Sequence, residues 1–254
     1  LVTTPANKNG DVDPEILFVA NIRGIKTIYK GGGAQAIAAM AYGTQTVLKV
    51  DKIFGPGNQY VTCAKKLVNI DEVSIDMLAG PSEVAIYADE TCVPEFVAAD
   101  LLSQAEHGAD SQVILVAVNQ QIIEKVTQEI HKQLPLLPRL EVIEKSFLNR
   151  RFIVVENKEE AFDFLNEYAP EHLIIASDNA EQLSEKVRSA GSVFLGNLSP
   201  ESAGDYASGT NHSLPTNGLA KTFSGVSVDS FVKKITFQKL NATGVKSIGH
   251  AVEK

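Results

Sequence analysis

The feature that most constrains the fold of this chain is the alternation of short apolar, β-branched runs with segments of helical pattern. A strand, a helix and a second, parallel strand form the βαβ unit, whose crossover is right-handed. The alternation therefore predicts an α/β fold with a mainly parallel sheet. The expected strands are residues 25–29, 45–50, 83–88, 112–117, 151–155, 173–176 and 192–196. A first helix is expected to begin at Asp13-Pro14. The other expected helices cover residues 34–41, 56–68, 94–104, 158–168 and 180–189.

Composition and charge argue against several classes of protein. The 254 residues include 23 Lys and Arg and 31 Asp and Glu, and the resulting net charge of −8 argues against a nucleic-acid partner, which requires a basic face. No apolar run approaches the roughly 20 residues of a membrane span. The two cysteines, Cys63 and Cys92, are too few for a disulfide framework. We therefore expect a cytoplasmic protein without a nucleic-acid or membrane partner.

Both ends of the sequence have the pattern of a piece cut from a longer chain. Leu1 is not an initiator Met, and no charged start of a signal sequence follows it. Residues 1–5 have the pattern of a strand that enters a loop, and residues 244–254 that of a helix that stops without a cap. Before that helix, residues 231–240 alternate apolar residues with lysines, as an exposed or partner-paired strand does. Functional residues beyond either end are therefore expected.

Two glycine-rich turns follow expected strands and open expected helices. Residues 31–33 (Gly-Gly-Gly) loosely fit the G-x-G-x-x-A pattern, in which glycines let a pyrophosphate approach a helix N-terminus, and Asp51 lies twenty residues further on. Residues 55–57 (Gly-Pro-Gly) form the second turn. The alternative is an ordinary βα turn that needs a positive φ. The two motifs therefore leave nucleotide binding open.

Two pairs of polar residues are candidates for chemistry. Gln104 and His107 are spaced i and i+3 at the end of an expected helix, so both project from one face and could share a metal. The alternative is a His that caps the helix C-terminus, and the spacing alone favours it. Glu171 and His172 stand directly before an apolar strand, which suits general acid–base catalysis; a solvated loop pair is the alternative.

The densest polar stretch of the chain covers residues 199–212. Small residues surround Asp205, Asn211 and His212, so a ligand could reach these side chains easily. An ordinary loop does not need so many groups that must all find hydrogen-bond partners. This stretch therefore favours a binding or catalytic site.

Six motifs taken together resemble the histidinol dehydrogenase family. They occur in that family's order and spacing across nearly all of the chain. The longest of them, Asp-Leu-Leu-Ser-Gln-Ala-Glu-His-Gly at residues 100–108, rarely arises by chance. The motifs lie at residues 32–38, 52–58, 79–83, 100–112, 169–173 and 203–216.

The resemblance implies a NAD-dependent, zinc-requiring enzyme that oxidises L-histidinol to L-histidine through L-histidinaldehyde, at the end of histidine biosynthesis. It implies Gln104, His107 and Asp205 as zinc ligands, and this mixed nitrogen and oxygen set suits zinc. It also implies a catalytic pair. His172 would accept the alcohol proton, and Glu171 would activate the water that is added between the two oxidations.

The resemblance further implies contacts to substrate and cofactor. NAD would contact Gln35 and Asn58, and zinc would mainly orient the substrate. The expected substrate-binding residues are Ser82, Gln104, His107, His172 and Asp205.

The family forms an intertwined homodimer, in which each C-terminal segment is exchanged between subunits. A fourth zinc ligand, a His, comes from that segment, and His250 does not match it. We therefore expect the isolated chain to bind zinc weakly and to turn over slowly.

For the fold, the resemblance and the strand pattern imply two incomplete Rossmann-like parallel-sheet units in tandem with a C-terminal extension. The expected domains are residues 1–81, residues 82–226 and, as the start of the exchanged segment, residues 227–254. Two other functions stay open. One is a catalytically incomplete α/β module that only assembles with a second chain. The other is a zinc hydrolase, which needs metal, water and a Glu-His pair but no NAD.

Overall fold

Two small parallel sheets and three helices form the first part of the computed structural model, which describes residues 2–71, 73–77 and 80–253. β1 (Val2–Thr4) pairs with β2 (Ile28–Lys30), and β3 (Lys52–Ile53) pairs with β4 (Ser74–Ile75). The connecting helices are α1 (Pro14–Ile22), α2 (Gly33–Tyr42) and α3 (Gln59–Asp71). A local core joins α2, α3 and β3, formed by Ile37, Met40, Ala41, Ile53, Val68 and Val73.

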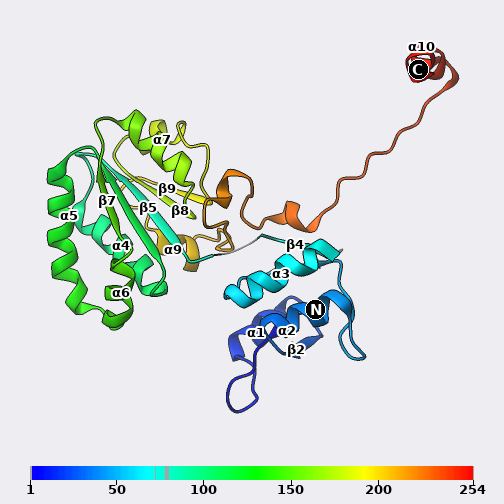
Figure 1. Ribbon diagram of the computed structural model, residues 1–254, viewed down its shortest axis with the longest axis horizontal. Coiled ribbons are helices and arrows are strands. Elements are labelled where there is room, and N and C mark those ends of the chain that lie inside the picture. Colours follow the sequence, from blue (N-terminus) through cyan, green and yellow to red (C-terminus); the bar gives the residue numbers. More distant parts are fainter. Residues whose placement is uncertain (1, 72, 78–79, 254) are drawn as a thin grey trace.

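A five-stranded parallel sheet forms the second part, in the strand order β7-β6-β5-β8-β9 (Figure 1). β5 is the central strand: the chain adds β6 and β7 on one side of it and β8 and β9 on the other. The strands are β5 (Glu83–Ala88), β6 (Gln112–Ala117), β7 (Arg151–Val154), β8 (His172–Ala176) and β9 (Ser192–Leu195). The helices are α4 (Pro94–His107), α5 (Gln120–Gln133), α6 (Leu140–Phe147), α7 (Lys158–Tyr168), α8 (Ala180–Ser184) and α9 (Glu201–Tyr206), with a short 3-10 helix η1 (Leu134–Leu136).

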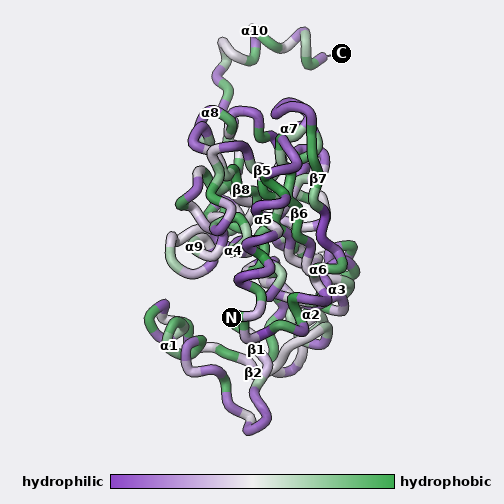
Figure 2. The backbone as a smooth tube through the Cα atoms, turned by 90° about the vertical axis from the view of Figure 1, so that its left-hand side faces the viewer, coloured by the Kyte–Doolittle hydropathy of each residue, from purple (hydrophilic) through white to green (hydrophobic). Residues whose placement is uncertain are grey.

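Alternate side chains of this sheet pack against helices on opposite faces, because successive residues of a strand point to opposite sides. Val84 and Ile86 of β5 pack with α4, α5 and α6, whereas Ala85 and Tyr87 pack with α7 and α8. Burial on both faces explains why these strands are continuous apolar runs. They form a hydrophobic centre in Figure 2. The predicted α/β fold with parallel sheets is therefore confirmed.

Most expected elements are present, and several have shifted ends. β5 and β6 have the expected bounds, and α1 begins as expected, with the Asp13 side chain accepting the Glu15 N–H. The helix expected from residue 56 begins at Gln59, and that expected over 180–189 ends at Ser184. Leu1 of the expected first strand, Ala79 of the motif at 79–83 and Lys254 of the expected last helix lie outside the described residues.

The prediction of a strand at residues 45–50 is wrong. Thr44 and Val47 close a turn, in which the Thr44 N–H donates to the Val47 carbonyl at 2.8 Å. The Val50 N–H donates to the carbonyl of Met40, near the end of α2, at 2.9 Å. Both valines still pack against the local core of α2 and α3. The apolar pattern thus reflected packing against α2 and α3, while the backbone hydrogen bonds are made within a turn and to the end of α2.

Residues 227–254 form a C-terminal arm, which after residue 231 extends away from the rest of the molecule (Figure 1). After η2 (Leu219–Lys221) and η3 (Val228–Phe231), residues 232–241 run without helix or sheet to α10 (Ala242–Val252). The arm is anchored where the Phe231 ring stacks on Phe54, with centroids 4.1 Å apart. The strand expected at residues 231–240 therefore pairs with no strand of the described chain, and its pairing with a partner stays a prediction.

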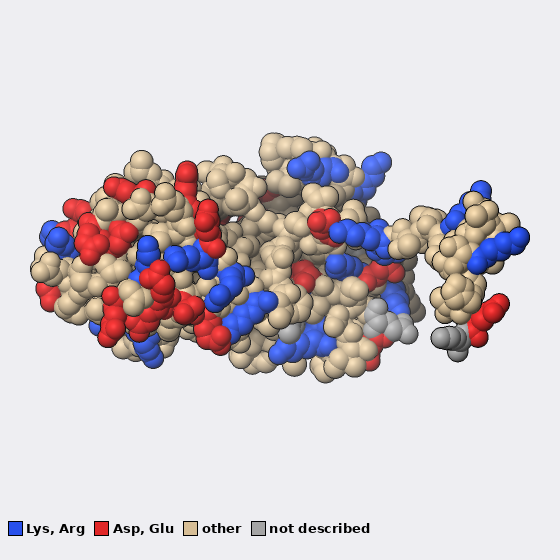
Figure 3. Space-filling model, turned by 90° about the horizontal axis from the view of Figure 1, so that it is seen from above, with Lys and Arg blue, Asp and Glu red and all other residues tan. Residues whose placement is uncertain are grey.

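Acidic and basic side chains are interspersed on the face of the molecule seen in Figure 3. Acidic groups are prominent there, as the net charge of −8 leads one to expect. Among residues 2–71, 73–77 and 80–253, no helix has the length and apolar character that crossing a membrane would require.

Candidate active site

A cavity of about 430 Å³ brings together segments that lie far apart in the sequence. One side is formed by the turn at residues 55–57, which follows β3, and by Asp76 and Met77, which follow β4. The other side is formed by residues that begin or precede β5 and β8, by the end of α4 and by α9. The cavity thus lies between the carboxyl ends of β3 and β4 and the amino ends of β5 and β8. Its lining includes Ser82, His107, Glu171, His172, Asp205 and His212.

His172 is a buried imidazole with one free ring nitrogen. It is the first residue of β8 and only 3% exposed, because the parallel register places it beside Val84 of β5. Its Nδ1 lies 3.3 Å from the backbone oxygen of Glu83, which can only accept, so Nδ1 carries the proton. Nε2 has no hydrogen-bond partner among the described residues and lies 3.8 Å from Asp205 Oδ1. Burial lowers the pKa of His172, with Asp205 opposing, which favours the neutral ring, whose Nε2 lone pair can accept a proton.

Glu171 is a buried carboxyl group next to this imidazole. It is 6% exposed, and its Oε2 accepts the N–H of Glu83 at 3.0 Å. Oε2 also lies 3.7 Å from Nδ1 of His172. Burial, and to a smaller extent the neighbouring carboxylates, raise the pKa of Glu171 to about 8, against the opposing hydrogen bond from Glu83. A carboxyl with such a pKa can act as a base near neutral pH.

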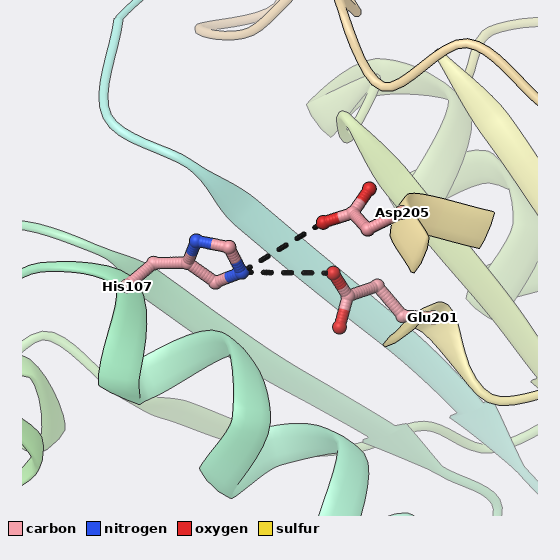
Figure 4. A group of neighbouring side chains, drawn as sticks. All are labelled: His107, Glu201 and Asp205. Atoms are coloured by element: carbon pink, nitrogen blue, oxygen red, sulfur yellow. Dashed lines mark ion pairs between the residues drawn. The ribbon is translucent and has the colours of Figure 1, made fainter. Parts of the chain in front are cut away.

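α4 and α9 bring a set of potential metal ligands together (Figure 4). Nε2 of His107 lies 3.8 Å from Oε1 of Glu201 and 3.9 Å from Oδ2 of Asp205. One ligand atom from each of these three residues lies within 4.8 Å of the other two. Glu201 and Asp205 are spaced i and i+4, so both project from one face of α9 toward the end of α4.

Gln104 lies on α4, one turn before His107. It is 0% exposed, and neither its amide oxygen nor its amide nitrogen has a hydrogen-bond partner among the described residues. A buried amide left unsatisfied costs about 1–3 kcal/mol. A cation bound by the amide oxygen would remove much of that cost. The donor set of Gln104, His107 and Asp205 therefore fits zinc.

Glu201 is the residue of this cluster that the sequence did not single out. It is 0% exposed, its N–H donates to Asp100 Oδ1 at 3.3 Å, and its Oε1 has no hydrogen-bond partner among the described residues. Burial first, and then Asp205, raise the pKa of Glu201 to about 8. It lay in the polar stretch at 199–212, and its i, i+4 spacing to Asp205 is the signal that could have found it.

The structure brings some of the other expected residues together and leaves others apart. Ser82 lines both the 430 Å³ cavity and an adjoining one of about 870 Å³, which Asn58 also lines. The Asn58 side chain accepts the N–H groups of Tyr60 and Val61 and so begins α3. Gln35 is exposed in the first turn of α2 and is not part of either lining.

The chain is similar in sequence to histidinol dehydrogenases over its full length. The family model of histidinol dehydrogenase matches residues 1–254. The histidinol dehydrogenase of Bacteroides thetaiotaomicron is 57% identical over 254 residues, which are 100% of this chain and 59% of that protein. The histidine biosynthesis trifunctional protein of Neurospora crassa is 51% identical, over 98% of this chain and 29% of that protein.

Solved structures give the same result. The crystal structure of histidinol dehydrogenase from Elizabethkingia anophelis matches with a TM-score of 0.96 at 57% identity, over 99% of this chain and 58% of that one. An acetylating aldehyde dehydrogenase from Geobacillus thermoglucosidasius, 13% identical over 85% of this chain and 63% of that one, has a TM-score of 0.53 and shares the fold alone. The chain spans 59% of the length of its bacterial relative. Because the family model matches the whole chain, the chain belongs to the histidinol dehydrogenase family.

Proposed function

We propose that the protein oxidises L-histidinol to L-histidine through the aldehyde, with NAD and zinc, in the cytoplasm. The observation that carries this proposal is the convergence of two groups of side chains on one cavity. His172 and Glu171 supply proton acceptors, and His107 and Asp205 line the same cavity. The buried, unpartnered amide of Gln104 lies one helical turn before His107. Family membership supports the same reaction.

The residues suited to hold zinc are Gln104, His107 and Asp205, with a fourth ligand from a second copy of the protein. When bound, zinc would polarise and orient the substrate, and NAD would take up hydride in each oxidation. Ser82 lines the same cavity and is proposed to contact the substrate, as are the three zinc-binding side chains and His172.

His172 would act as the base in both oxidations. Its neutral Nε2 would accept the hydroxyl proton of the alcohol in the first oxidation. In the second it would accept a hydroxyl proton of the hydrated aldehyde. Because the Glu83 carbonyl fixes the tautomer through Nδ1, Nε2 keeps its lone pair available.

Glu171 would act between the two oxidations. In its ionised form it would take a proton from the water that adds to the aldehyde carbon. Protonated His172 would return its proton to the carbonyl oxygen, which gives the hydrate and restores the neutral imidazole for the second oxidation. The Glu83 N–H holds Oε2 of Glu171 in place. In this mechanism His172 accepts the hydroxyl protons, and Glu171 deprotonates the attacking water.

The adjoining 870 Å³ cavity is the proposed NAD cleft. It shares Gly57, Ser82 and His107 with the 430 Å³ cavity, which we call the reaction cavity. A cofactor bound in the cleft would therefore reach the substrate. Asn58 lines it directly, whereas the proposed contact from Gln35 needs a cofactor that extends beyond the lining. The strand order β7-β6-β5-β8-β9 is that of the first five strands of doubly wound dinucleotide-binding sheets. This order supports an incomplete Rossmann-like unit at residues 82–226. A second incomplete unit at residues 1–81, where the described strands form two two-stranded sheets, is part of the proposal.

We further propose a homodimer in which residues 227–254 pack against a second copy. The arm exposes large apolar side chains, with Ile235 68% and Phe237 90% exposed. Exposed large apolar side chains gathered on one segment favour an interaction site. An arm exchanged in a two-fold dimer would bury it on both subunits.

The test is an absorbance assay for reduced nicotinamide with the full-length protein, L-histidinol, NAD and zinc. The proposal predicts two reduced cofactors per histidinol and a loss of the signal on adding a chelator. A zinc hydrolase or a module that only assembles would give a flat trace. Family membership favours neither of these two alternatives.

A further inference from the structure

The buried ion pair of Lys65 and Asp76 lies in the wall of the reaction cavity and has no part in the mechanism above. Lys65 comes from α3, and Asp76 follows β4. Their side chains are 3% and 2% exposed, and both residues line the 430 Å³ cavity. A pair of charges removed from water in this way needs a reason, since a buried ion pair often adds no stability compared with apolar residues of similar volume.

The pair holds both backbone groups of Gly55. Lys65 Nζ, besides its contact with the carboxylate of Asp76, donates to the Gly55 carbonyl at 2.9 Å. Asp76 Oδ2 accepts the Gly55 N–H at 2.8 Å. Asp76 Oδ1 also accepts the N–H of Met77 at 2.7 Å, which links the residues after β4 to the same network.

The residue held in this way has a backbone conformation that glycine favours. Gly55 has φ of +130°, and no atom lies within 4 Å of the position that a Cβ would take. The backbone conformation, rather than lack of space, therefore requires glycine. A Cβ on Gly57, by contrast, would lie 2.4 Å from the side chain of Val61, so the other end of the turn is packed onto α3.

The turn separates the two cavities of the proposed site. Residues 55–57 all line the reaction cavity, and Gly57 and the following Asn58 line the proposed NAD cleft. A shift of Gly55 would therefore move the wall between substrate and cofactor.

We propose that Lys65 and Asp76 are positioning residues, which hold the turn at residues 55–57 in the shape that forms the cofactor side of the reaction cavity. This inference rests on the proposed function where it concerns NAD. The pair acts through the turn, so its loss lowers cofactor affinity and leaves the zinc-binding side chains in place.

The first experiment is hydrogen exchange of the unmodified full-length protein, resolved to single amides. The expected result is that the Gly55 amide exchanges as slowly as the interior amides of α3. Rapid exchange of the Gly55 amide overturns the inference, because the Asp76 carboxylate would then not hold it.

The second experiment compares Lys65→Met, Asp76→Asn and the double variant that carries both changes with a control, Lys132→Met. The control removes the exposed lysine of a surface ion pair. NADH affinity is measured by fluorescence, with zinc content and thermal stability alongside. Lys65→Met should weaken NADH binding about tenfold, because a turn that is no longer held must be ordered when the cofactor binds. Zinc content should stay unchanged, and Lys132→Met should bind NADH normally.

The double variant separates positioning from simple stability. It removes the unpaired charge that Lys65→Met leaves buried, so it should regain thermal stability, but it still lacks the donor to the Gly55 carbonyl and should stay weak in NADH binding. Recovery of both properties overturns the inference. If the variants do not fold, the exchange of the Gly55 amide decides. An unmodified protein that neither binds NADH nor reduces NAD contradicts the proposed function, while the exchange result still tests the pair.

Discussion

The chemistry of His172 depends on its surroundings more than on the imidazole itself. The Glu83 carbonyl fixes its tautomer, and burial lowers its pKa. Replacing the ring with the shorter amide of Asn would keep a group able to donate to the Glu83 carbonyl and would remove the base at Nε2.

His172→Asn should therefore lower kcat by about 10²–10⁴-fold, the usual contribution of a general base. Zinc content should be unchanged, because His172 is not among the proposed zinc ligands. Steady-state kinetics combined with metal analysis checks this expectation. A variant with full kcat, or one that has lost its metal, would contradict the assigned role.

Glu171→Gln should spare the first oxidation and slow the second, so that the aldehyde accumulates and a carbonyl-trapping reagent captures it. Since burial raises the pKa of Glu171 to about 8, its base form increases as the pH rises through that value. In the unmodified protein, oxidation of added aldehyde should accelerate over the same range, and the variant should lose this dependence. If both oxidations slow equally, Glu171 does not act on water alone.

At the scale of elements, α4 serves both the core and the site. Leu101 is fully buried in the core that α4 shares with α5, α6 and β5, while Gln104 and His107 lie in the last turn of the same helix. The helix that presents the proposed ligands is thus held by ordinary apolar packing.

Leu101→Ala should lower the free energy of unfolding by about 2–5 kcal/mol, the range for large-to-small changes in a packed core. The matched control is Leu136→Ala, at a position 82% exposed, which should stay within about 0.5 kcal/mol of the unmodified protein. Denaturant unfolding monitored by circular dichroism measures both. Equal effects of the two changes would show that α4 is not held in this way.

Some elements could be predicted from the sequence because their burial is complete. β5 and β6 are covered on both faces, so their apolar runs have the same bounds as the strands. Residues 45–50 have a similar pattern, but hydrogen bonds to Thr44 and to the end of α2 decide their structure, and no local pattern records these bonds.

The candidate site was predictable in part for the same reason. The motifs that contain Gln104, His107, Glu171, His172 and Asp205 indicated chemistry. The structure places all of these except Gln104 in the lining of one cavity, and Gln104 is buried on α4 one turn before His107. Glu201 was missed because the burial of a carboxylate depends on how α9 packs against α4. The pairing of Lys65 with Asp76 likewise depends on the meeting of α3 with the end of β4.

At the scale of the whole molecule, the arm at residues 227–254 is the feature that a single copy leaves exposed. Phe237→Asp and Ile235→Asp should shift the full-length protein from dimer to monomer, because a buried unpaired carboxylate is costly in an apolar interface. Sedimentation velocity measures the shift, with Leu136→Asp as the surface control. Dimers that persist in both arm variants would contradict the exchanged arrangement.

The central claim is that one cavity holds zinc and histidinol between α4, α9 and the start of β8. Diffraction from crystals of the full-length protein with zinc and histidinol, recorded at the zinc absorption edge, tests it most directly. The account predicts an anomalous peak for a zinc ion bound by Gln104, His107 and Asp205, with the substrate beside His172. An ion bound elsewhere, with these three side chains turned away from it, would contradict the account.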